Sequence, residues 1–263
     1  GPFPRLEVVG AAVATVTAQI IVLLILVAEI LRDHGEANVL HKIRLLSRPD
    51  IACLKGVFRI GTPTALQGSL YCIISMILTR MVSGFGDDAI AVQRVGGQIE
   101  SLSWNTADGF GSALNAFMGQ NYGAGKKDRI FKSVRICLAM AVAVCGGIVL
   151  FLAIFCRPLF SIFTTDQNVI NIGIDMLRFM APCYTIYVFI EVLSGALRGT
   201  GDVLLPTLIT LGGVCLIRIP WIMFVLPAHH TTTCVMLSYP ISWITTTALI
   251  IPYYLYRKKH AYD

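Results

Sequence analysis

Long apolar segments separated by short polar ones run along the whole chain. A helix that crosses a membrane needs about 20 predominantly apolar residues, and seven segments of the chain reach that length. Their bounds are Val8–Leu31, Gly56–Val82, Ala89–Met118, Val134–Cys156, Val169–Leu197, Val203–Leu226 and Cys234–Tyr256. This pattern predicts an all-α fold, a polytopic membrane protein of about seven transmembrane helices.

The third apolar segment is unusual because polar residues run along one of its faces. At about 100° per residue, one narrow arc of this predicted helix carries Gln93, Gly97, Glu100, Trp104, Asp108, Gly111 and Asn115. Ionisable groups are costly in hydrocarbon. A polar stripe on a membrane helix therefore indicates a water-filled cavity or a partner beside it.

The composition supports a membrane protein. Hydrophobic residues make up 56% of the 263 residues and charged residues 14%, whereas about a quarter of a soluble domain is charged. The mean hydropathy is +0.72, so we expect the lipid bilayer to surround the chain. The net charge of +6 comes from basic residues between apolar segments rather than from a surface patch, so we expect no nucleic-acid partner.

The positions of the basic residues predict the orientation. Lys and Arg are absent from the connections Ser83–Asp88 and Pro227–Thr232 and gather on the opposite ones. These basic positions include Arg32, Lys42, Arg44, Arg48, Lys55, Lys126, Lys127, Arg129, Lys132, Arg198, Arg257, Lys258 and Lys259. Because cytoplasmic loops carry the excess of Lys and Arg, the first span is predicted to begin outside and the carboxyl terminus to be cytoplasmic.

An odd number of spans that starts outside leads us to expect further spans upstream. The chain begins Gly-Pro-Phe-Pro, without an initiator Met, and we expect it to be a fragment. The connection Asp33–Asp50 is longer and more charged than the others. It is therefore predicted to link two bundles, with an interfacial amphipathic helix around Asn38–Leu46.

The spacing of cysteine, histidine and glycine gives no sign of catalysis. The eight cysteines form no C-x-x-C pair and are expected to be small buried hydrophobes rather than metal or redox ligands. No glycine-rich stretch is followed by the Lys-Ser/Thr of a phosphate-binding loop. A membrane-embedded enzyme is the alternative, but His229–His230 alone is too little for a metal site. We predict no catalytic residue, no metal and no enzyme activity.

Four short motifs occur in order along the chain. They are G-T-P-T-A-L-Q (Gly61–Gln67), A-V-Q (Ala91–Gln93), G-Q-N-Y-G-A-G (Gly119–Gly125) and G-A-L-R-G-T-G-D (Gly195–Asp202), the last followed by Pro206. In this order and spacing they resemble the carboxyl-terminal half of a MATE (multidrug and toxic compound extrusion) family efflux transporter. The opening G-A-A-V-A-T (Gly10–Thr15) resembles the last helix of that family's first bundle, so the resemblance covers nearly the whole chain.

The resemblance implies twelve helices in two six-helix bundles, and export of cationic or amphipathic small molecules in exchange for H⁺ or Na⁺. On that template residues 1–33 are the last helix of the N-terminal bundle, residues 34–55 the cytoplasmic inter-bundle linker, and residues 56–263 the C-terminal six-helix bundle. The missing N-terminal bundle would be a partner, and the full-length protein a monomer. Members of the family often carry an acid where Tyr71 or Tyr187 stands here, so their ion site is not carried over.

Three acidic residues are candidates for coupling to a cation: Glu100, Glu191 and Asp108. Glu100 lies about 12 residues into its span, roughly 18 Å deep, where a carboxyl group suits a proton or cation carrier. The alternative is a static ion pair with Arg218, which lies at a compatible depth. Glu191 is a candidate cation relay or, by helical spacing, a packing partner of Arg198. Asp108 either binds a cation or hydrogen-bonds across helices.

The candidates for the substrate cavity are Gln67, Tyr71, Gln93, Asn105, Tyr184, Tyr187 and Arg218. Aromatic rings stack on flat cations, worth up to about 2 kcal/mol when desolvated, and amides either orient a substrate or join helices. An interfacial belt or packing role is expected for Tyr239, Trp243, Tyr253, Tyr254 and Tyr256. Close helix approach is expected at Gly96, Gly97, Gly109, Gly111, Gly146 and Gly147.

Together these features predict secondary active multidrug efflux, that is, xenobiotic transport by an H⁺ or Na⁺ antiporter through alternating access. The coupling ion is the only cofactor expected, and the predicted location is the bacterial inner (plasma) membrane. The alternative is a lipid-linked saccharide flippase of the same superfamily. Such proteins usually line their cavity with several arginines, whereas here acids and aromatics compete with Arg94 and Arg218.

Overall fold

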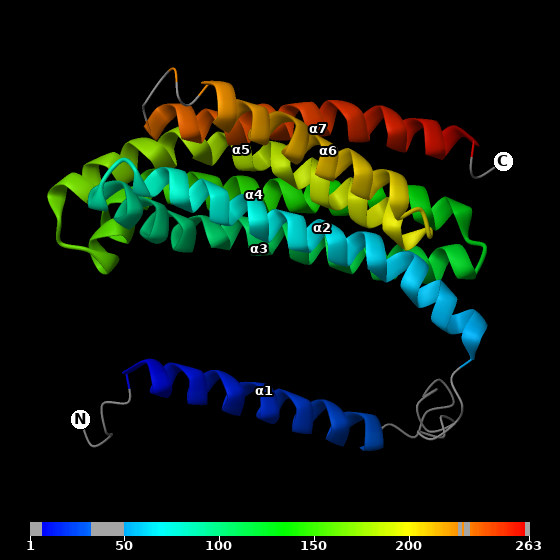
Figure 1. Cartoon of the computed structure of the whole chain (residues 1–263). Helices are drawn as coiled ribbons and strands as arrows, with labels where there is room; N and C mark the ends of the chain where they lie inside the picture. Colours follow the sequence, from blue (N-terminus) through cyan, green and yellow to red (C-terminus); the bar gives the residue numbers. More distant parts are fainter. Residues whose placement is uncertain (1–6, 33–49, 226–227, 229–231, 261–263) are drawn as a thin grey trace. The chain divides into compact units, whose positions relative to one another are not determined.

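The chain folds into seven long helices over the residues that the computed structural model describes, which are 7–32, 50–225, 228 and 232–260. The helices are α1 (Glu7–Arg32), α2 (Ile51–Ser83), α3 (Asp87–Gly123), α4 (Lys127–Phe163), α5 (Gln167–Gly199), α6 (Leu204–Pro220) and α7 (Thr232–His260), with a π-helical turn, η2 (Trp221–Val225), after α6 (Figure 1). No strand occurs in these residues. The all-α prediction and its seven segments are confirmed.

The helices extend past the predicted spans where charged residues continue the helix beyond the apolar segment. The clearest case is α4, which runs from Lys127 to Phe163 rather than from Val134 to Cys156. Likewise α2 begins at Ile51, so the last residues assigned to the linker are helical. Asp50 explains this start, because its side chain accepts a hydrogen bond of 2.9 Å from the backbone N–H of Ala52 and so caps the first turn.

The contact pattern divides the chain into two units, Gly1–Lys55 and Gly56–Asp263. In the first unit, α1 is a single apolar helix whose window Ala12–Glu29 has no buried residue. Its assignment to another bundle stays a prediction, since an exposed apolar helix needs lipid or other helices around it. The predicted interfacial helix at Asn38–Leu46 lies outside the described residues.

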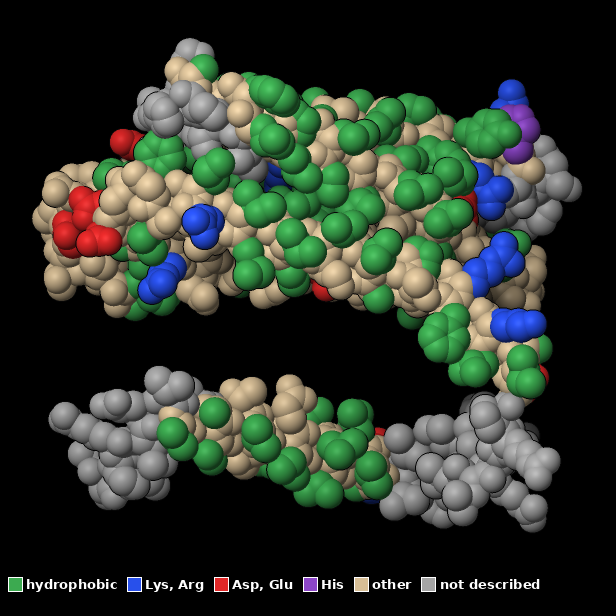
Figure 2. Space-filling model, viewed as in Figure 1, with side chains coloured by type: hydrophobic (Ala, Val, Ile, Leu, Met, Phe, Trp, Pro, Cys, Tyr) green, Lys and Arg blue, Asp and Glu red, His purple; other side chains and the backbone are tan. Residues whose placement is uncertain are grey.

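Six of the described helices are long and apolar enough to cross a membrane. The remaining one, α3, has 37 residues and so exceeds the necessary length, but its polar stripe lowers its hydropathy. On the face in Figure 2, hydrophobic side chains cover the middle of the unit Gly56–Asp263, and most charged side chains lie near its ends. Such a surface suits a bilayer, provided that the polar stripe of α3 is turned away from lipid.

Only one edge of the stripe is buried, because the face that α3 turns toward α5 is mostly apolar and includes, of the stripe, Glu100 and Gly111. The backbones of α3 and α5 approach closely at two glycines: a Cβ on Gly111 would lie 2.8 Å from the carbonyl oxygen of Glu191, and one on Gly195 would collide with the carbonyl of Gly111. The predicted close approach therefore holds for Gly111. It does not hold for Gly97, Gly109, Gly146 and Gly147, where a Cβ would have no neighbour within 4 Å.

By contrast, α2 packs loosely. Its buried side chains are Gln67, Ile74, Leu78 and Val82. The three apolar ones join a cluster with Ala89 of α3, Val214 of α6, and Cys234 and Val235 of α7. Elsewhere α2 stands away from the other helices, and the space beneath it is where the cavities described below lie.

The crossing of α3 and α5 makes a prediction about stability. Gly195→Ala is expected to lower the melting temperature of the complete protein in detergent, because overpacking a close contact costs about 1–3 kcal/mol. Differential scanning fluorimetry measures this.

Gly147→Ala is the matched control, because a Cβ there meets nothing within 4 Å and alanine favours a helix over glycine. Its melting temperature should stay level or rise. Equal melting temperatures for Gly195→Ala and the native protein would contradict the close packing.

Candidate functional site

Glu100 lies on the inward face of α3 and is 9% exposed. Its Oε1 atom is fully buried and makes no hydrogen bond of ordinary geometry within the described residues. The hydroxyl of Tyr184 on α5, which likewise makes none, is its polar neighbour. A buried carboxylate without a cationic partner is strongly destabilising unless a proton, a cation or a ligand neutralises it. The structure thus leaves one acidic group open to binding.

Arg218 comes from α6 and is 8% exposed. Its Nε donates a hydrogen bond of 3.1 Å to Ser242 Oγ, and its guanidinium lies 4.0 Å above the centre of the Tyr239 ring. A cation–π contact in a desolvated place replaces part of the lost hydration. Among the described residues the ion pairs are Arg198–Glu191 and Arg257–Asp202, so the possible static pair between Glu100 and Arg218 is not formed.

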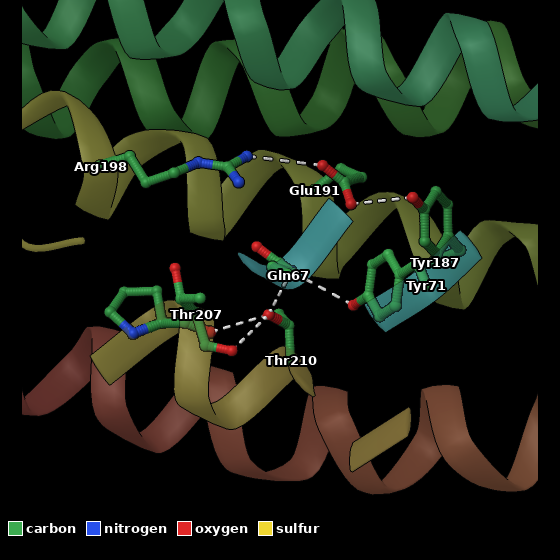
Figure 3. A network of polar contacts seen from close by, with 8 residues as sticks. Gln67, Tyr71, Tyr187, Glu191, Arg198, Thr207 and Thr210 are labelled. Carbon is green, nitrogen blue, oxygen red and sulfur yellow. Dashed lines mark hydrogen bonds and ion pairs between the residues drawn. The ribbon is translucent and has the colours of Figure 1, made fainter. Parts of the chain in front are cut away.

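Glu191, on α5, is held by two side chains of its own helix (Figure 3). Tyr187 donates a hydrogen bond of 2.8 Å to Glu191 Oε1, and Arg198 Nη2 lies 3.6 Å from Glu191 Oε2. Glu191 is therefore the packing partner of Arg198, the alternative that helical spacing gave to a cation relay. Because both oxygens of Glu191 already have partners, it is less available to a ligand than Glu100 is.

Gln67 fastens α2 to α6 (Figure 3). Its Nε2 donates hydrogen bonds to Thr210 Oγ1 at 2.7 Å and to Tyr71 Oη at 3.2 Å, and the Thr210 hydroxyl in turn donates to the Pro206 carbonyl at 3.0 Å. A buried amide with both donors occupied joins helices. Gln67 therefore acts here as a contact between helices.

Aromatic rings gather next to Glu100. The ring of Trp104, on α3, lies 4.5 Å from Tyr187, 5.3 Å from Trp243 and 6.3 Å from Tyr184, centre to centre. Tilted and edge-to-face arrangements at such distances stabilise aromatic pairs. The cluster brings together α3, α5 and α7.

These groups surround a cavity of about 480 Å³, which we call the aromatic cavity. Helices α2, α3, α5, α6 and α7 all contribute to its wall. Its aromatic lining is Tyr71, Trp104, Tyr187, Tyr239 and Trp243, and its ionisable lining is Glu100, Glu191 and Arg218. The size suits a drug-sized molecule.

A second cavity, of about 380 Å³, adjoins the first. We call it the methionine cavity because Met176 and Met180 of α5 and Met236 of α7 line it. Gln93 and Arg94 of α3 line it too, and so does Glu100.

The structure does not bring every predicted residue to a cavity. Asp108 and Asn105 are exposed and line neither cavity, and Tyr184 is buried behind the walls. The helical period explains the first two, because at about 100° per residue they lie roughly 80° and 140° around α3 from Glu100. The polar face that reaches the cavities is therefore narrower than the stripe in the sequence.

Two aromatic residues of the cavity wall were predicted to have another role. Tyr239 and Trp243, expected in an interfacial belt or in packing, line the aromatic cavity, and Trp243 is only 2% exposed. Their spacing with Thr246, which lines the same cavity, is i, i+4, i+7. This spacing puts all three on one face of a helix, and it is the signal that could have identified them.

Six helices long and apolar enough to cross a membrane, together with cavities that have polar and aromatic walls, fit a multi-pass membrane transport protein. The MatE family model matches residues 63–224, and the chain belongs to this family, the MATE family of multidrug efflux transporters.

Three curated relatives illustrate the similarity. YoeA, a probable multidrug resistance protein of Bacillus subtilis, is 25% identical over 262 residues, which are 98% of this chain and 56% of the relative. NorM, a probable multidrug resistance protein of Thermotoga maritima, is 31% identical over 220 residues, 83% of this chain and 46% of the relative. A FAD transporter of Shewanella oneidensis is 28% identical over 189 residues, which are 70% of this chain and 40% of the relative. The chain spans about half the length of these relatives.

The fold also matches a solved structure. A crystal structure of a MATE protein in the straight conformation superposes with a TM-score of 0.82 at 20% identity, covering 95% of this chain and 56% of that chain. The architecture is thus that of about half of a MATE transporter.

The ion pair on α5 makes a second prediction. In a double-mutant cycle with Glu191→Gln and Arg198→Ala, the losses in unfolding free energy should be less than additive by about 0.5–1 kcal/mol, as for a partly buried ion pair. Denaturation of the complete protein in detergent measures it. Strict additivity would mean that the two side chains do not interact.

Proposed function

We propose that the complete protein containing this chain exports cationic or amphipathic small molecules in exchange for H⁺ or Na⁺. The observation that carries the proposal is Glu100, a buried carboxyl group in the wall of both cavities that forms no ion pair with a described residue. Membership of the MATE family and the names of the relatives support the same class of activity.

The coupling follows from the cost of an unpaired buried charge. Either a coupling cation or the positive group of a substrate neutralises the Glu100 carboxylate, and each is attracted to it for the same reason. Because both compete for one carboxyl group, binding of one favours release of the other. This competition is the minimal requirement for an antiporter.

The walls of the aromatic cavity suit flat, amphipathic substrates. Trp104, Tyr187 and Trp243 offer ring faces and edges close to Glu100. A cation near such rings gains about 0.5–2 kcal/mol when it is desolvated. The rings would thus bind the body of a substrate while the carboxyl group binds its charge.

We further propose that the chain lies in a bacterial inner membrane with a cytoplasmic carboxyl terminus. The support is the distribution of Lys and Arg among the connections, together with the positive-inside rule. In this orientation the connection between α2 and α3 is outside, and alternating access would come from movement of this bundle against a second one.

A second candidate is export of an anionic aromatic compound such as a flavin nucleotide. It is favoured by the similarity to a FAD transporter and by Arg218, a buried cation without an acidic partner among the described residues. A lipid-linked saccharide flippase would also use arginines, but the two acids on the wall of the same cavity disfavour both anionic substrates.

Glu100→Gln tests the first proposal. In a host without its own drug pumps, the complete native protein is expected to reduce ethidium accumulation in a manner that depends on a proton or sodium gradient. The amide cannot exchange a cation, so the variant should lose at least about tenfold in efflux rate, equivalent to 1.4 kcal/mol in the barrier. Everted membrane vesicles with an imposed gradient give the rate.

Asp175→Asn is the matched control, because Asp175 is exposed on α5 and lines neither cavity. It should transport like the native protein. Unchanged gradient-dependent efflux in Glu100→Gln would refute the role of Glu100. Native protein that exports flavin nucleotides but not ethidium would favour the second candidate.

A further inference from the structure

The aromatic cavity and the methionine cavity meet at a short common wall. Four residues line both of them: Ser75 of α2, Gly97 and Glu100 of α3, and Tyr239 of α7. The direct route from one cavity to the other runs past these side chains. Glu100, the carboxyl group assigned to coupling, lies at this junction.

Gly97 is the member of this wall whose identity packing does not explain. A Cβ on Gly97 would have no neighbour within 4 Å, whereas one on Gly111 of the same helix would lie 2.8 Å from a backbone oxygen of α5. Glycine in a helix interior is destabilising relative to alanine. Gly97 is exposed, and its missing side chain leaves open space where the two cavities share their wall, one helical turn before Glu100.

The methionine cavity is built to receive part of a ligand. Methionine side chains are unbranched and polarisable, so Met176, Met180 and Met236 can adapt to apolar groups of different shape. The Gln93 side chain and Arg94 provide polar contacts on the opposite helix. A mixed surface of this kind suits amphipathic molecules and discriminates little among them.

We propose that the methionine cavity is a second substrate site for amphipathic aromatic compounds, and that Gly97 keeps open the passage that joins it to the aromatic cavity. The inference rests on the proposed export function. In the proposed orientation the methionine cavity is nearer to the outside, because its wall includes residues next to the connection between α2 and α3. A substrate leaves the aromatic cavity past Glu100 and enters the methionine cavity before release.

This order of events gives the junction a role in coupling. A substrate that moves past Glu100 loses its contact with the carboxylate. A coupling cation can then bind to Glu100 while the methionine side chains still hold the substrate. Blocking the passage should stop transport without removing the aromatic site. A large side chain at position 97 would then reduce the transport rate while leaving the affinity for the substrate unchanged. A purely structural role of Gly97 does not predict this difference.

The test is a size series at position 97 in the complete protein: Gly97→Ala, Gly97→Leu and Gly97→Phe. Efflux of ethidium in the pump-deficient host should fall stepwise, with little change for alanine and at least a tenfold loss for phenylalanine. The dissociation constant of ethidium for the purified protein, from its fluorescence, should stay within about threefold of native, equivalent to less than 1 kcal/mol.

Gly147→Ala, Gly147→Leu and Gly147→Phe form the matched control. Gly147 is exposed on α4, a Cβ there meets nothing within 4 Å, and it lines neither cavity. This series should transport like the native protein. If Gly97→Phe does not reach the membrane, Gly97→Leu supplies the same comparison. Equal effects in the two series, or efflux by Gly97→Leu and Gly97→Phe at the native rate, would overturn the passage.

Photolabelling with ethidium monoazide, followed by peptide mapping, tests the second site itself. In the native protein, label is expected both around Met176–Met180 and around Trp243, which lie in different cavities. Label confined to the aromatic cavity would overturn the second site. Absence of gradient-dependent efflux by the native protein would instead refute the proposed function, so the two failures can be told apart.

Discussion

An apolar bundle tolerates ionisable side chains only where each one has a partner or faces water, and this constraint organises the whole interior. Glu191 has Tyr187 and Arg198, and Arg218 has Ser242 and Tyr239. Glu100 has no cationic partner among the described residues, and its polar neighbour is the uncharged hydroxyl of Tyr184. The two cavities lie where this carboxyl group is, so an acidic group without a cationic partner and open space occur together.

The position of Glu100 depends on how unevenly the helices pack. On one side, α3 is fixed to α5 by near contact of their backbones at Gly111 and Gly195. On the other side, α2 buries few side chains and leaves room beneath it. Tight packing on one side holds the functional face of α3 in place, and loose packing on the other leaves a volume that a ligand can fill. The same helix thus serves as scaffold and as cavity wall.

Hydropathy was sufficient to predict the seven helices, because it is a property of a single segment. The helical period placed Glu100 and Gly111 correctly on a buried face of α3, but most of that face is apolar and lies beside the polar arc rather than on it. The cavity walls could not be predicted in this way, because they depend on how several helices cross. Asp108 shares the polar arc of Glu100 in sequence yet is exposed, and Trp243, expected in packing or at an interface, lines the aromatic cavity. Gly97 and Gly111 look alike in the sequence, and only the neighbouring helices distinguish open space from backbone contact.

All lining residues of both cavities come from α2 to α7, within the unit Gly56–Asp263. The carboxyl group, the aromatic rings and the methionine side chains thus belong to one bundle. In the proposed mechanism, a second bundle would change which side of the membrane reaches this site. Exchange of a cation for a substrate at Glu100 is then a local event, and its coupling to access depends on whether occupancy of these cavities alters the loose packing of α2.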